Sequence, residues 1–189
     1  MKFVNLLILF TIIGLKSLAQ DSLWQINSFN EVLSFGLPTN FKSAQFAYIK
    51  GFAGQLNSNS YGFQYYDSIL LKVSDENMFQ ISLLGFISGR SSDSTLKGYS
   101  ALVIDTSIGG TKGLMAKFTT NDNSKNYKQI YYYVTMANNR YCWFYALSPS
   151  TEENNEGINF FFKSIKFNSE RLKEMEYRLT PVYLKKDHL

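Results

Sequence analysis

Residues 128–149 read KQIYYYVTMANNRYCWFYALSP, and this stretch decides the fold. Two runs of aromatic and β-branched residues flank the pair Asn138-Asn139, and such runs are typical of strands. Asparagine tolerates the positive φ angles that two-residue hairpin loops require. The stretch therefore predicts a β-hairpin in which Val134 faces Trp143.

Both faces of this predicted hairpin are apolar or aromatic. One face carries Ile130, Tyr132, Val134, Met136, Tyr141, Trp143, Tyr145 and Leu147, and the other carries Tyr131, Tyr133, Thr135, Cys142, Phe144 and Ala146. A strand pair with one face in water would alternate with polar residues. We therefore expect the hairpin to lie centrally in its sheet, with cover on both sides.

Strand signals also dominate the rest of the chain. Alternating or β-branched runs predict further strands at 33–38, 45–52, 61–73, 78–88, 99–106 and 113–119, with a short one at 165–167. Gly109-Gly110 predicts a turn, and the polar residues 120–126 predict a loop. The fold class is therefore α+β, an antiparallel β-sheet covered by helices.

The helical cover is expected after the hairpin. Ser150 and Glu153 match a capping box, which predicts a helix over residues 151–163. Its apolar stripe comprises Ile158, Phe161, Phe162 and Ile165, at helical spacing. The polar residues 169–179 predict a second, weakly amphipathic helix that ends before Pro181.

The N-terminal residues predict export. Lys2, an apolar run over 3–15 and the triplet at 17–19 (Ser-Leu-Ala) match a secretory signal peptide. The run is shorter than the roughly 20 residues of a membrane-spanning helix. We expect residues 1–19 to be a signal peptide, 20–168 a single domain, and 169–189 a polar C-terminal helix and tail. The protein would then be secreted or periplasmic, with no transmembrane segment after leader cleavage.

Composition excludes several classes of function. The formal charge is +4, and the scattered basic residues do not indicate nucleic-acid binding. Cys142 is the only cysteine, so no internal disulfide forms, and its apolar neighbours predict a buried thiol. His188, the only histidine, is the penultimate residue. It is poorly placed for a catalytic triad or a zinc site, so the sequence predicts no catalytic residue, metal or cofactor.

The aromatic residues give the one positive indication of function. Tyr132, Tyr141, Trp143 and Tyr145 are candidates for a stacking platform that binds a sugar or the apolar side chains of a peptide. The alternative is that these four residues are ordinary core. The leading hypothesis is an exported, non-enzymatic binding or accessory protein with an unknown protein or glycan partner, although enzyme activity stays open.

Two alternative functions belong to other classes of protein. A carboxylate-based hydrolase of polysaccharide or peptidoglycan would need two acids about 5–10 Å apart in one cleft. A closed barrel would instead hold an apolar ligand inside the sheet.

The chain also resembles a known family. The segment F-x-L-P-x-x-F (Phe35, Leu37, Pro38, Phe41), the run of strands, the aromatic hairpin and FFFKSIKF at 160–167 are similar to PsbP/Mog1-like domains. The resemblance implies an α/β/α sandwich around an antiparallel sheet. It also implies a role as assembly factor, accessory subunit or binding partner, with no catalytic residues. This chain departs from the pattern at 91–113, where strand-like residues stand in place of the family's central helix.

Overall fold

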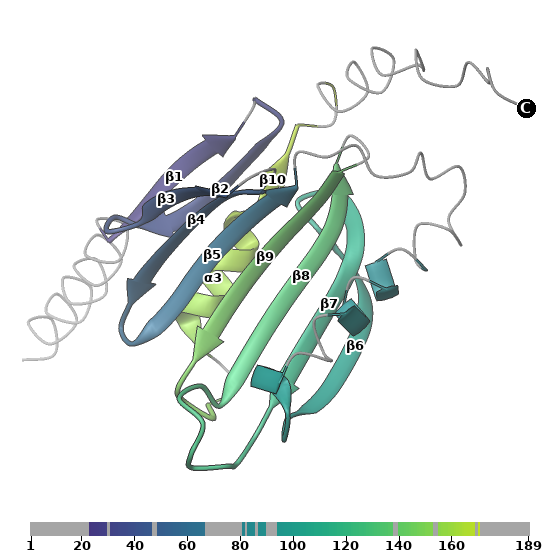
Figure 1. Ribbon diagram of the computed structural model, residues 1–189. Helices are drawn as coiled ribbons and strands as arrows, with labels where there is room; N and C mark the ends of the chain where they lie inside the picture. The colour runs from purple at the N-terminus through teal and green to yellow at the C-terminus, as the bar shows by residue number, and fades with distance from the viewer. Residues whose placement is uncertain are drawn as a thin grey trace, which may run out of the picture.

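The computed structural model describes residues 23–29, 31–46, 49–66, 81, 83–85, 87–89, 94–137, 140–152, 155–168 and 170. Their strands form two antiparallel sheets (Figure 1). The large sheet comprises β3 (Lys42–Phe46), β4 (Ile49–Leu56), β5 (Asn59–Tyr66), β9 (Arg140–Ser148), β8 (Gln129–Ala137), β7 (Thr111–Thr119) and β6 (Ser100–Ile108), in that order. The small sheet has the order β1 (Trp24–Phe29), β2 (Leu33–Pro38) and β10 (Lys166–Phe167).

The predicted hairpin is confirmed as β8 and β9, which lie in the interior of the large sheet. Val134 pairs with Trp143, as the alternation of residues predicts. The two faces contribute to different hydrophobic clusters. Tyr133 and Phe144 belong to a cluster on the rear face of Figure 1, while Val134 and Trp143 belong to one on the front face. The hairpin is therefore a central element whose two faces both pack.

The rear face is covered by the helix α3 (Glu156–Ser164) and by the small sheet (Figure 1). The ring of Phe35 on β2 lies 4.8 Å from that of Phe63 and 5.7 Å from that of Phe144. The hydroxyl of Ser164 accepts a hydrogen bond from the Gly36 N–H at 2.8 Å, which joins α3 to β2. All four residues of the predicted apolar stripe, Ile158, Phe161, Phe162 and Ile165, are buried.

The predicted start of this helix is wrong by five residues. Asn155 is the N-cap, and its side-chain oxygen accepts a hydrogen bond from the N–H of Ile158 at 3.2 Å. Ser150 instead accepts from the N–H of Glu152 within a local turn. The side chain of Gln129 donates to the Glu152 carbonyl at 3.0 Å, which fixes the segment before α3 to β8. Glu153 of the predicted capping box lies outside the described residues.

The predicted strand over 78–88 is also wrong, because its described residues 81, 83–85 and 87–89 are helical. Leu83 and Ile87, four residues apart, are buried against the front face, whereas Ile81 and Leu84 are exposed. Periodicity alone does not separate a short apolar strand from a buried helical segment. The helical cover of the front face therefore precedes the range 91–113, within which the short 3-10 helix η1 (Ser94–Leu96) adds the buried Leu96.

The remaining predictions have mixed outcomes. The strands at 33–38, 99–106 and 113–119 are confirmed as β2, β6 and β7, with the Gly109-Gly110 turn between the last two. The predicted strand 45–52 is two strands, β3 and β4, and the short strand near 165–167 pairs with β2 in the small sheet. Residues 67–73, the predicted signal peptide over 1–19 and the tail from 171 lie outside the described residues.

The antiparallel sheet of the expected α+β fold is present, but strands predominate and helices cover less of it than expected. The large sheet is open, with β3 and β6 as its edges and α3 across one face. The described strands therefore do not form the closed barrel considered as an alternative. In the part of the chain that is described, no helix has the length and apolar character needed to cross a bilayer.

Candidate functional site

The four candidate aromatic residues lie on the front face of β8 and β9. The Trp143 ring lies 5.0 Å from Tyr132, edge to face, and 5.6 Å from Tyr145. Trp143 is only 7% exposed and belongs to the same cluster as Leu83. Tyr132, Tyr141 and Tyr145 are half-buried. The structure therefore brings the four side chains together, with Trp143 at the base and the tyrosines nearer the surface.

A glycine on the neighbouring strand lets one of these tyrosines lie across the sheet. Gly62 on β5 pairs with Tyr145 on β9. A Cβ atom at Gly62 would come within 2.1 Å of the Tyr145 Cζ atom, so the ring covers the glycine. Glycine inside a strand often marks such a close approach. The glycine within the aromatic run NSYGFQYY is the sequence signal for this approach.

The residues beside Tyr145 on β4 and β5 have small side chains or none. Ala53 pairs with Gly62, and Gly51 lies on the same face of β4 two residues earlier. Tyr66 at the end of β5 lies edge to face with Tyr141, with ring centroids 6.5 Å apart. We call this surface the tyrosine face, defined by Tyr66, Tyr141 and Tyr145 beside Gly51, Ala53 and Gly62. It extends the predicted platform towards the β3 edge.

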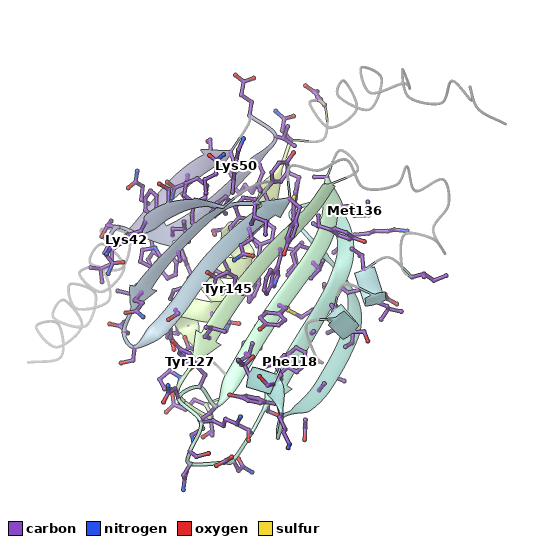
Figure 2. All side chains as sticks on the ribbon, in the orientation of Figure 1. Lys42, Lys50, Phe118, Tyr127, Met136 and Tyr145 are labelled. Atoms are coloured by element: carbon purple, nitrogen blue, oxygen red, sulfur yellow. The ribbon has the colours of Figure 1, made fainter. Side chains whose placement is uncertain are left out.

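Polar groups line one end of the tyrosine face. The hydroxyls of Ser60 and Tyr127 are 3.2 Å apart, and the Gln55 side chain donates to Ser60 at 3.3 Å. Burial raises the pKa of Tyr145, and the nearby Tyr127 raises it further. Tyr145 therefore stays a neutral phenol at physiological pH. Figure 2 shows Tyr145 over the middle of the sheet and Tyr127 near the strand ends. This arrangement can stack on a flat apolar group and hydrogen-bond at its rim.

The acidic residues are spread over different elements. Asp105 is on β6, Asp122 is in the loop after β7, where it accepts hydrogen bonds from Ser124, and Glu156 begins α3. Of the described residues that line the groove beside α3 and the smaller cavity beside β2 and β10, only Glu31 carries a carboxylate. The described residues include no group of three or more potential metal ligands. Cys142 is 1% exposed, which confirms the predicted buried thiol.

No family model and no curated protein matches this sequence. The solution structure of cyanobacterial PsbP (CyanoP) from Synechocystis sp. PCC 6803 is similar, with a TM-score of 0.53. The similarity covers 77% of this chain and 92% of that chain at 10% sequence identity. The chain has a PsbP-like fold. The resemblance to PsbP/Mog1-like domains is thereby confirmed at the level of fold, and no residue role is transferred at this identity.

Proposed function

We propose that this chain is an exported, non-enzymatic binding or accessory protein that contacts its partner through the tyrosine face. The sequence of residues 1–19 supports a signal peptide and a secreted or periplasmic location. The PsbP-like fold supports a single domain over 20–168 with an α/β/α arrangement. The polar sequence of residues 169–189 supports a C-terminal helix and tail. The accessory role is the one that the resemblance implies.

The tyrosine face carries this proposal. Tyr141 and Tyr145 are only half-buried, although they stand on β9, the central strand of the large sheet. Tyrosine combines a flat apolar ring with a polar hydroxyl, and so it suits surfaces that bind a protein or a glycan. Trp143 packs against both Tyr145 and Tyr132, and so it holds the Tyr145 ring in place. The expected partner is therefore a protein or glycan that presents a flat apolar group.

A pull-down from the native envelope or culture medium tests the proposal. We expect the tagged mature protein to recover a partner that the double variant Tyr141→Ser/Tyr145→Ser does not recover. Ile26→Ser is the matched control, because Ile26 is 60% exposed on β1, away from the tyrosine face. Circular dichroism checks that both variants fold. Recovery of no partner by the wild type, or equal recovery by the double variant, would refute the proposal.

A further inference from the structure

A concave surface lies on the rear of the sheet, between α3 and the strands β6, β7 and β8. It is a groove of about 490 Å³, within the range of small-molecule sites. Its apolar lining comprises Leu102, Ile104, Ile108, Met115, Tyr131, Ile158 and Phe162. The charged residues that line it among the described part of the chain are Lys117 and Lys163, both basic. The groove is thus mostly apolar, with two lysines in its wall.

The outer wall of the groove exposes apolar side chains on an edge strand. Leu102 and Ile104 of β6 are 59% and 49% exposed, while Ile158 and Phe162 of α3 form the buried inner wall. Natural edge strands are usually protected by charged residues, proline or bulges. An occupant of the groove would cover Leu102 and Ile104, which gives their exposure a physical reason.

One end of the groove is closed by the turn between β6 and β7. Gly109 in this turn has a φ of +60°, and its carbonyl accepts a hydrogen bond from the Phe167 N–H at 3.2 Å. A Cβ atom at Gly109 would lie 2.5 Å from the Ile165 carbonyl oxygen. Glycine therefore lets the turn abut β10, which blocks this end.

The other end carries a positioned lysine. Lys117 lies six residues beyond the start of β7, and its ammonium is 5.5 Å from the centroid of the Tyr131 ring. The Tyr131 hydroxyl donates to Gln129, whose amide donates to the Glu152 carbonyl at 3.0 Å. These bonds fix the ring beneath Lys117. The groove thus runs from the Lys117 ammonium at one end to a closed end at Gly109, with Lys163 of α3 also in its wall.

We infer that this groove binds a single-chain amphiphile with a carboxylate head, that is, a free fatty acid. The carboxylate pairs with Lys117, and the chain runs past Met115 and between Ile104 and Phe162 towards Gly109. A charge-assisted hydrogen bond at one end and apolar burial along the rest match the two parts of such a ligand. The groove is on the opposite face of the sheet from the tyrosine face, so the experiments test the two proposals independently.

Displacement of a fluorescent fatty acid from the mature protein by hexadecanoate tests this inference. Lys117→Gln should weaken binding roughly tenfold, the equivalent of one charge-assisted bond. Lys42→Gln is the matched control, because Lys42 lies on the opposite edge of the sheet and should not affect affinity (Figure 2). Hexadecylamine, with the same chain and a positive head, should compete much more weakly than hexadecanoate.

A second pair of variants tests the apolar wall without disturbing the core. Ile104→Asp should abolish hexadecanoate binding, whereas Val103→Asp should not, because neighbouring residues of a strand point to opposite faces. Absence of hexadecanoate binding, equal binding of hexadecylamine, or equal affinity of the Lys117→Gln and wild-type proteins would overturn the inference. Binding only to phosphatidylglycerol vesicles would overturn it in favour of a membrane surface.

Discussion

The phenol of Tyr133 should make the fold sensitive to alkaline pH. Its side chain is fully buried on the rear face of β8, and its hydroxyl donates to the Thr111 carbonyl at 2.6 Å. Burial raises the pKa of Tyr133 to about 12, compared with about 10 for an exposed tyrosine. The proton is therefore held more tightly in the folded protein than in the unfolded chain.

The sign and size of the effect follow from this difference. Between about pH 10 and pH 12 the unfolded chain loses this proton while the folded protein keeps it, so the free energy of unfolding decreases as the pH rises. The stabilisation is fully present below the unfolded pKa and is lost as the pH passes the folded pKa. Two pKa units correspond to about 2.7 kcal/mol.

Urea unfolding of the wild type and Tyr133→Phe, across the alkaline range, measures this contribution. The variant should be less stable by about 1 kcal/mol near neutral pH, because it lacks the bond to Thr111. It should then lose about 2.7 kcal/mol less than the wild type as the pH rises. An equal decrease in both proteins would refute the reasoning.

Three further substitutions test packing and capping, each by urea unfolding. Asn155→Ala should cost about 1 kcal/mol, because the Ile158 N–H loses its cap, whereas Asn155→Asp should retain most of the stability. Phe161→Ala should cost about 3–5 kcal/mol, because this ring is fully buried in the rear cluster; a cost below about 1 kcal/mol would contradict the packing. Gly62→Ala should cost about 1–3 kcal/mol through overlap with Tyr145, and Tyr145→Ala in the same chain should relieve that overlap.

The sequence predicted the elements in which one strong pattern dominates. The register of β8 and β9 followed from the turn predicted at Asn138-Asn139 and from the period-two alternation on both sides of it. The apolar stripe of α3 followed from helical spacing, but its start did not. Ser150 and Asn155 are both good capping residues. The Gln129 side chain holds the segment before α3 through its hydrogen bond to the Glu152 carbonyl, and Asn155 is the cap. This hydrogen bond is a tertiary contact, so the local sequence does not show it.

The helical residues between 81 and 89 show where sequence reasoning failed. Apolar residues occupy most of this run, so nothing in it showed that Leu83 and Ile87 pack while Ile81 and Leu84 are exposed. The tyrosine face and the groove beside α3 could not be predicted from the sequence for a related reason. The tyrosine face depends on the pairing of β5 with β9, which joins segments far apart in the chain. The groove depends on the packing of α3 against β6, β7 and β8, which is also a tertiary contact.

The same pairing divides the large sheet into two local halves. Strands β3, β4 and β5 form one antiparallel meander, and strands β6, β7, β8 and β9 form another. The pairing of β5 with β9 is therefore the long-range contact that joins the two meanders. Forming a pairing between distant strands carries a loop-closure entropy cost that pairings between consecutive strands avoid. A chain cut between the two meanders should therefore reassemble from its fragments, because neither fragment loses a neighbouring strand of its own meander.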